Sequence, residues 1–232
     1  MAHRFAIGDI HGCFLTFKTL LEEKISPSKE DHVYLLGDYI DRGPSARQVL
    51  EYIIDLKWQG YQLFPIMGNH EDMLIKATTD QAFLNAWFNN GAEETLRSFD
   101  VPESILFEYE GLSGIPDRIM HFISNLPLYH DLEDYIVVHA GLNFRSNNVL
   151  SDREAMLWSR EFQYDGSKIK NKTIVHGHTP MPYVTISNNL RKNNEKLVNL
   201  DAGCVYKDLP GYGRLVGMDL DARELFVQEN VD

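Results

Sequence analysis

Five times along this chain, a short apolar run leads directly into a segment that contains aspartate, asparagine or histidine. The three runs of the first half cover residues 5–7, 33–36 and 61–67, and segments with the spacing of an amphipathic helix follow them. Repeated strand–helix units favour a largely parallel sheet. Because ligands of such sheets bind at the carboxyl ends of the strands, we expect a site where these segments meet.

The five segments combine carboxylate, imidazole and amide side chains at the ends of predicted strands. They are Gly8–Gly12, Gly37–Gly43, Gly68–Glu71, His139–Gly141 and Gly177–Thr179. Each segment alone is weak, since Asp-x-His is common in turns and a single histidine is more often a hydrogen-bonded core residue. Together and in this order they predict one site, whose oxygen and imidazole ligands suit Mn²⁺, Fe or Zn²⁺. The chain has no cluster of thiolates for a structural zinc site.

The rest of the chain divides into a helical stretch and a region rich in predicted strands. Residues of about 78–127 have helical spacing, carry no chemical motif and are interpreted as a helical insert or cap. Strands are expected over 135–138, 173–175, 183–186, 196–200, 215–220 and 225–227, with a hairpin connection at 219–223. We expect this half to form a mixed or antiparallel sheet that faces the first, within one domain of residues 1–232.

Charge and composition argue against several classes of protein. The chain has 34 acidic and 22 basic residues, a net charge of −12, and no block of lysine and arginine, so no nucleic-acid partner is expected. No run approaches the roughly 18 apolar residues of a membrane helix, and no membrane partner is expected. The first residues lack the features of a secretory signal, and two cysteines cannot form a disulfide framework. A reduced, cytoplasmic compartment is therefore predicted.

The series of motifs resembles the PPP family of metallophosphatases. This family comprises the serine/threonine phosphoprotein phosphatases and related bacterial and phage enzymes, within the calcineurin-like metallophosphoesterase superfamily. The segment Asp201–Cys204 is similar to the family's Asp-x-Gly-Cys element. The resemblance implies an α/β fold, a four-layered α/β/β/α sandwich of two mixed sheets flanked by helices, here with a helical insert. It also implies a site for two divalent metal ions.

The resemblance assigns the metal ligands by matching position. Asp9 and His11 would hold the first ion, Asp38 would bridge both ions, and the second ion would be completed by Asn69, His139 and His178. Manganese is the expected metal, although iron, zinc and cobalt also suit these ligands. A further histidine, His176, has the same strand parity as His178 and is kept as a substrate-side candidate.

The catalytic roles also follow from the resemblance. Two ions about 3.5–4 Å apart can share a hydroxide that attacks phosphorus directly, so no phosphoenzyme is needed. His70 would be the general acid, oriented by Asp41, which would also raise its pKa. Arg42 and Arg160 would bind the phosphate oxygens as planar, bidentate donors. The motif around Arg160 is short, and a surface arginine beside a buried tryptophan is the alternative interpretation.

The leading functional hypothesis is a serine/threonine phosphoprotein phosphatase, with a phosphorylated protein or peptide as its substrate. The alternatives are a diadenosine polyphosphate hydrolase of the bis(5'-nucleosyl)-tetraphosphatase type and an enzyme of small phosphoesters. Asp41 before Arg42, and Glu71 after His70, favour the protein phosphatase, because dinucleotide hydrolases usually differ there. A non-catalytic binding module is disfavoured, since every expected ligand and acid position is kept. The sequence does not indicate a regulatory subunit.

Overall fold

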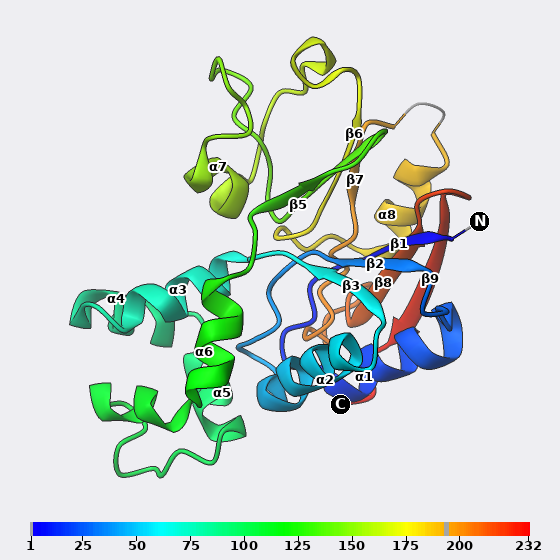
Figure 1. The fold of residues 1–232 in the computed structure, drawn as a ribbon. Helices are drawn as coiled ribbons and strands as arrows, with labels where there is room; N and C mark the ends of the chain where they lie inside the picture. Colours follow the sequence, from blue (N-terminus) through cyan, green and yellow to red (C-terminus); the bar gives the residue numbers. More distant parts are fainter. Residues whose placement is uncertain (1, 193–194) are drawn as a thin grey trace.

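A computed structural model describes residues 2–192 and 195–232, and its strands form two mixed sheets (Figure 1). The first sheet has the order β3-β2-β1-β8-β9. Its strands are β1 (Arg4–Ile7), β2 (His32–Leu35), β3 (Gln62–Pro65), β8 (Arg214–Asp219) and β9 (Glu224–Glu229). The first three strands run parallel, whereas β8 is antiparallel to β1 and β9 is antiparallel to β8.

The second sheet has the order β4-β5-β6-β7 and faces the first. Its strands are β4 (Tyr129–Asp131), β5 (Tyr135–Val138), β6 (Thr173–His176) and β7 (Leu197–Asn199). Strands β5, β6 and β7 are parallel, and β4 is an antiparallel edge strand. The α/β class with two mixed sheets is confirmed.

The alternation of side chains along the strands creates the layers. On β1, Phe5 and Ile7 pack against helices, while Ala6 between them belongs to the core shared by the two sheets. Strand β5 alternates in the same way, with Val137 facing the first sheet and Val138 facing the outside of the second sheet. Helices cover the outer faces, so the order of layers is helices, sheet, sheet, helices.

Helices connect the parallel strands and carry the insert. Those around the first sheet are α1 (Phe14–Thr19), its π-helical continuation η1 (Leu20–Ile25), α2 (Ala46–Trp58) and α3 (Asn69–Ala77). The predicted helical insert contains α4 (Gln81–Phe88), α5 (Ala92–Ser98), η2 (Tyr109–Gly114) and α6 (Asp117–Ser124). The second half contains α7 (Arg153–Trp158), η3 (Gly166–Ile169) and α8 (Tyr183–Leu190). Buried residues of the insert belong to the same core cluster as those of α1 and α2.

Two predictions about the second half are wrong. The segment 183–186 is not a strand but the start of helix α8, which follows Pro182 and buries Ile186 with Tyr183 and Leu190 packed nearby. Those positions are three and four residues apart, so the period is helical, and a four-residue window could not separate it from alternation. Strands β8 and β9 form the expected hairpin but join the first sheet through β1. The short strand β4 was not predicted.

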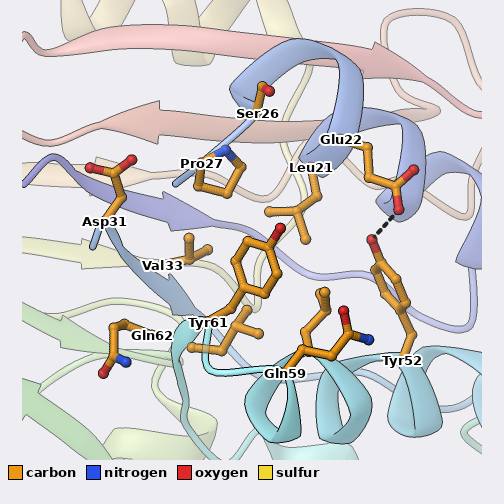
Figure 2. A pocket seen from close by; sticks show the side chains of 12 residues that line it. Leu21, Glu22, Ser26, Pro27, Asp31, Val33, Tyr52, Gln59, Tyr61 and Gln62 are labelled. Carbon is orange, nitrogen blue, oxygen red and sulfur yellow. Dashed lines mark hydrogen bonds between the residues drawn. The ribbon is translucent and has the colours of Figure 1, made fainter. Parts of the chain in front are cut away.

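The parallel strands bring their carboxyl ends together at one edge, where the predicted motifs lie. At the opposite, amino end of β2 and β3, a cleft of about 280 Å³ is lined by Val33, Gln62 and Tyr61, among others (Figure 2). The length of the strands separates this cleft from the motif-bearing edge. Among the described residues, no helix has the length and apolar character needed to span a bilayer.

Candidate metal centre

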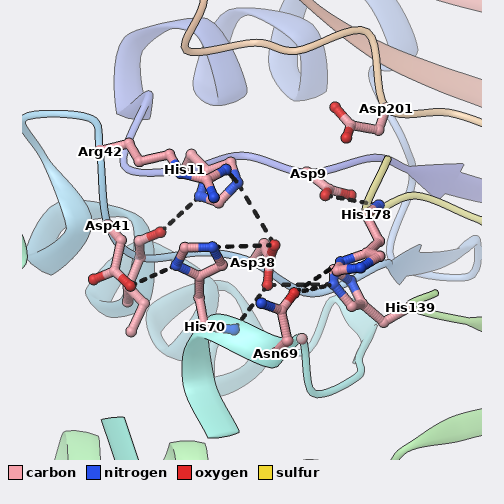
Figure 3. Close-up of polar contacts among 12 residues, drawn as sticks. Asp9, His11, Asp38, Asp41, Arg42, Asn69, His70, His139, His178 and Asp201 are labelled. Atoms are coloured by element: carbon pink, nitrogen blue, oxygen red, sulfur yellow. Dashed lines mark hydrogen bonds and ion pairs between the residues drawn. The ribbon is translucent and has the colours of Figure 1, made fainter. Parts of the chain in front are cut away.

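Asp38 lies at the middle of the site, and its two carboxylate oxygens face different partners (Figure 3). Oδ2 is 3.5 Å from His11 Nε2 and 3.9 Å from His70 Nε2. Oδ1 is 3.4 Å from His139 Nε2 and accepts the backbone N–H of His70 at 3.1 Å. One buried carboxylate therefore belongs to two groups of potential metal ligands, His11–Asp38–His70 and Asp38–His139–His178.

In the second group, two imidazole nitrogens and two side-chain oxygens converge. His139 donates its Nδ1–H to the backbone oxygen of Leu36 at 2.8 Å, and burial lowers the pKa of this imidazole, so Nε2 carries a lone pair. That lone pair faces Asn69 Oδ1 at 2.9 Å as well as Asp38. His178 Nδ1 lies 2.9 Å from the same amide oxygen. Such a convergence is stable when a cation lies at its centre.

The first group is built in the same way around His11. Its Nδ1–H donates to the backbone oxygen of Ile40 at 2.9 Å, and burial lowers the pKa of the ring far below its usual range. The lone pair on Nε2 accepts a hydrogen bond from the Arg42 guanidinium at 2.7 Å. A cationic group thus already faces this nitrogen.

Asp9 and Asp201 add buried negative charge beside these groups. Burial, followed by the charges of Asp201 and Asp38, raises the pKa of Asp9 well above its usual range. Asp9 Oδ2 accepts the backbone N–H of His178 at 2.9 Å, while Oδ1 and His178 Nε2 are buried without a hydrogen-bond partner among the described residues. Buried oxygen and nitrogen atoms that lack hydrogen-bond partners and lie among carboxylates suit divalent cations, because a bound cation would supply positive charge there.

The backbone around the site adopts conformations that side chains rarely favour. The φ angles of His11, Asp38, Asp41, Arg42 and His178 lie between 45° and 70°. Each left-handed position costs on the order of 1–3 kcal/mol and persists only where its surroundings hold it. The sharp turns aim several ligands from loops into one small volume.

Glu71 is one of the groups that hold these turns. Its buried carboxylate accepts the backbone N–H groups of Asp38 at 2.9 Å, Tyr39 at 2.8 Å and Gly68 at 3.0 Å. Burial and the charge of Asp38 raise the pKa of Glu71, and the donated N–H groups oppose that rise. Glu71 therefore shapes the loop after β2 and the start of α3.

Two glycines allow carboxylates to approach the backbone closely. A Cβ atom added to Gly68 would lie 2.1 Å from Asp38 Oδ1, and one added to Gly177 would lie 2.0 Å from Asp9 Oδ1. Neither distance is compatible with a side chain, so the two positions are restricted to glycine as long as the carboxylates keep their places.

The predicted acid His70 is tied to Asp41, which is fully buried. His70 Nδ1–H donates to Asp41 Oδ2 at 2.6 Å. Burial alone would lower the pKa of His70, but Asp38 and Asp41 together hold it above its ordinary value. With Nδ1 hydrogen-bonded to Asp41, Nε2 of the ring faces Asp38 Oδ2 at 3.9 Å.

The helical insert supplies two further partners of Asp41, and sequence reasoning missed both. The indole N–H of Trp87 on α4 donates to Asp41 Oδ2 at 2.8 Å. The hydroxyl of Thr95 on α5 donates to Oδ1 at 2.6 Å and accepts the backbone N–H of Asp41 at 2.8 Å. Neither residue belongs to a motif. The only available signal was that Trp87 and Thr95 each carry a polar group and are buried in helices that core packing otherwise accounts for.

The two predicted phosphate-binding arginines occupy different positions. Arg42 extends to His11 and lies over the ring of Tyr206, 5.9 Å from its centroid, while its backbone N–H donates to Gly91 in the insert at 3.1 Å. Arg160 is exposed, and its charge lies close enough to His178 to contribute to the lowered pKa of that ring, after burial and His139.

His176 lies outside both groups of potential ligands. Its ring meets that of Phe162 edge-on at 5.7 Å, and burial lowers its pKa to about 4. The parity argument that paired it with His178 does not apply, because the left-handed backbone at His178, with φ of 70°, ends the alternation of β6.

Two mixed sheets with buried carboxylates and histidines at their strand ends are the architecture of a metallophosphoesterase. The chain belongs to the calcineurin-like phosphoesterase family, whose sequence pattern matches residues 4–204. This confirms the family that the motifs indicated, and with it a requirement for divalent metal ions.

The chain is also similar to individual proteins. It is 28% identical to a bis(5'-nucleosyl)-tetraphosphatase, PrpE [asymmetrical], of Anoxybacillus flavithermus, over 86% of this chain and 85% of the relative. Its fold is similar to that of a candidate diadenosine tetraphosphatase, with a TM-score of 0.66, 19% identity and coverage of 100% and 95%. It is also similar to a protein serine/threonine phosphatase of Saccharomyces cerevisiae, with a TM-score of 0.59, 16% identity and coverage of 100% and 81%.

Proposed function

We propose that this protein hydrolyses the phosphoanhydride bonds of dinucleoside polyphosphates, with a bis(5'-nucleosyl) tetraphosphate as the preferred substrate. The observation that carries the proposal is the relative of that activity, which aligns along 86% of the chain. The diadenosine polyphosphate hydrolase, which the sequence analysis kept as an alternative, is thus preferred over the protein phosphatase.

The sequence difference that favoured a protein phosphatase has little bearing on substrate choice. Glu71 contacts backbone N–H groups of its own loops, so an acidic residue of another length there would alter the loop rather than a substrate contact. Asp41 is buried behind His70 and likewise has no exposed surface for a substrate.

Six side chains would hold the two metal ions: Asp9, His11, Asp38, Asn69, His139 and His178. Bound ions of this kind supply a nucleophile from water at neutral pH and neutralise charge on the phosphoryl group. Mn²⁺ is our first choice among the metals that mixed oxygen and imidazole ligands accept.

The protein's own side chains would do the rest of the chemistry. Arg42 and Arg160 would bind the non-bridging phosphate oxygens. The bound ions would screen these phosphate oxygens from the negative charge of the carboxylates. As the P–O bond to the leaving phosphate breaks, His70 Nε2 would give its proton to the leaving oxygen, and Asp41 would stabilise the charged ring before transfer. No covalent bond between enzyme and phosphorus is needed.

The second candidate is hydrolysis of phosphoserine or phosphothreonine, and the buried Asp41–His70 pair favours it. An alkoxide leaving group needs a proton far more than a nucleotide does, so a firmly held acid has greater value for a phosphoester. The partner would then be a phosphorylated protein or peptide.

A panel of substrates with the metal-loaded protein separates the two candidates. We expect kcat/KM for diadenosine tetraphosphate to exceed that for a phosphoserine peptide at least about 100-fold, a difference of about 2.7 kcal/mol in transition-state binding. Chromatography of the products should show two nucleotides with different numbers of phosphates, as the name of the asymmetrical relative implies. A higher kcat/KM for the peptide would reverse the assignment.

A further inference from the structure

A cleft of about 860 Å³ lies between the loop after β5 and the segment formed by α7 and the residues that follow it. Its volume falls in the range of roughly 300–1,000 Å³ that small-molecule sites occupy. We call it the aromatic cleft. The lining residues that matter here are Phe144, Trp158, Phe162, Tyr164, Glu154 and Glu161.

The rings of the aromatic cleft are held in place by their neighbours. The ring of Phe162 stacks on that of Phe144, with centroids 6.2 Å apart and planes inclined by 21°, and meets His176 at its edge. Trp158 packs edge-on against His178 at 6.3 Å. Because Trp158 and Phe162 are half-buried and fixed from behind, they offer a stacking surface that loses little entropy on binding.

One short segment, residues 158–162, lies between the aromatic cleft and the candidate metal centre. Trp158 and Phe162 line the cleft, whereas Arg160 between them does not. The ring of Trp158 in turn contacts that of His178, a proposed ligand of the metal centre, with centroids 6.3 Å apart. A ligand that reaches from the cleft to the metal centre would therefore pass from aromatic rings to a guanidinium within one segment.

The charge of the cleft rim selects the kind of group that fits. Glu154 and Glu161 are exposed, and neither carboxylate has a hydrogen bond or ion pair with another described residue. Asp152, Asp165 and Arg145 also line the cleft, so its charged residues are mainly acidic. An acidic rim repels phosphate and favours neutral groups that donate hydrogen bonds. A nucleoside is such a ligand, because its base is a flat, neutral ring with amino donors and its ribose carries hydroxyls.

We propose that the aromatic cleft binds one nucleoside of a dinucleoside polyphosphate, with the base stacked on Trp158 and Phe162 and the ribose toward the rim carboxylates. The phosphate chain then runs past Arg160 to the metal centre. This inference rests on the proposed function, but the cleft can be tested without turnover.

The first test measures adenosine binding by tryptophan fluorescence in the full chain without added metal. The chain has three tryptophans, and Trp158 is the one that lines the cleft. We expect a saturable change in emission that Trp158→Phe abolishes and that Trp58→Phe, at a residue 85% exposed, leaves in place. Phe162→Ala should raise the dissociation constant of adenosine about 10-fold or more, because base–aromatic stacking contributes substantially to binding.

The second test compares substrates in the metal-loaded protein. Phe162→Ala should lower the ratio of kcat/KM for diadenosine tetraphosphate to that for p-nitrophenyl phosphate about 10-fold. Phe107→Ala, at an exposed phenylalanine of the insert, should leave the ratio unchanged.

The outcomes separate the two proposals. Saturable adenosine binding through Trp158 supports the aromatic cleft as a nucleoside site even if the protein turns over no dinucleotide, in which case the proposed function fails. Turnover of the dinucleotide with an unchanged ratio in Phe162→Ala, or no adenosine binding at millimolar concentration, overturns the nucleoside site. Equal loss of phosphoserine-peptide turnover in Phe162→Ala would make the cleft a peptide groove and also overturn it.

Discussion

Single side chains decide how His70, the proposed general acid, is held. Replacing Trp87 by phenylalanine keeps a ring in the core but removes one of the donors to Asp41 Oδ2. A lost hydrogen bond to a buried carboxylate costs about 1.5–3 kcal/mol. We expect kcat for substrates with poor leaving groups to fall about 10-fold or more, and kcat for p-nitrophenyl phosphate to fall much less, because nitrophenolate leaves without a proton. Equal losses for both, measured against Trp58→Phe, would show that Trp87 has only a packing role.

A single added methyl group should disrupt the metal centre. In Gly177→Ala the new Cβ would lie 2.0 Å from Asp9 Oδ1, so the carboxylate or the loop must move. We expect loss of at least one bound metal ion per chain, measured by atomic emission, and a lower melting temperature. Gly60→Ala is the control for an added methyl group, because no atom lies within 4 Å of its Cβ, while its positive φ of 93° adds a backbone strain that Gly177→Ala lacks. That variant should keep its metal; if Gly177→Ala also keeps it, the close approach has no bearing on the site.

At the scale of elements, strand ends were predictable and the role of the insert was not. Apolar runs that end at glycine and aspartate mark β1 and β2 locally, so their edge of the sheet follows from sequence alone. The partners of Asp41 lie 46 and 54 residues away on α4 and α5, and no local pattern links such distant positions. The position of His176 relative to His178 could not be predicted for a related reason, since the turn at His178 breaks the strand period.

The contact between α5 and the loop after β2 can be tested with a pair of variants. Thr95→Val keeps the shape but removes the hydroxyl that donates to Asp41 Oδ1 and accepts its backbone N–H, so both buried groups lose a partner. We expect the free energy of unfolding to fall by about 2–4 kcal/mol in urea denaturation. Thr95→Ser keeps the hydroxyl and should lose about 1 kcal/mol through its missing methyl group. Similar losses in both variants would assign the effect to packing.

The whole molecule carries a net charge of −12, and part of that charge is concentrated in its interior. Burial raises the pKa of Asp9, and the charges of Asp201 and Asp38 raise it further, so these carboxylates are held together at a cost. Cations that bind only the folded state therefore stabilise it, by about 2.7 kcal/mol at 100 times their Kd. We expect Mn²⁺ to raise the melting temperature by several degrees and a chelator to reverse the rise.

Asp38→Asn supplies the variant for this test. It removes the charge that both groups of ligands share, so the Mn²⁺-dependent rise should largely disappear. Asp100→Asn, at a carboxylate that is 86% exposed, should keep the full rise. A Mn²⁺ response that survives in Asp38→Asn would contradict the shared position of Asp38.

Through their hydrogen bonds to Asp41, Trp87 and Thr95 make the insert part of the electrostatic environment of His70, the proposed acid. Exchanging residues 78–127 for the corresponding stretch of a relative would thus transplant proton-transfer behaviour along with surface shape. Chimeras of this family should be judged by their dependence on leaving-group basicity before their substrate range is compared.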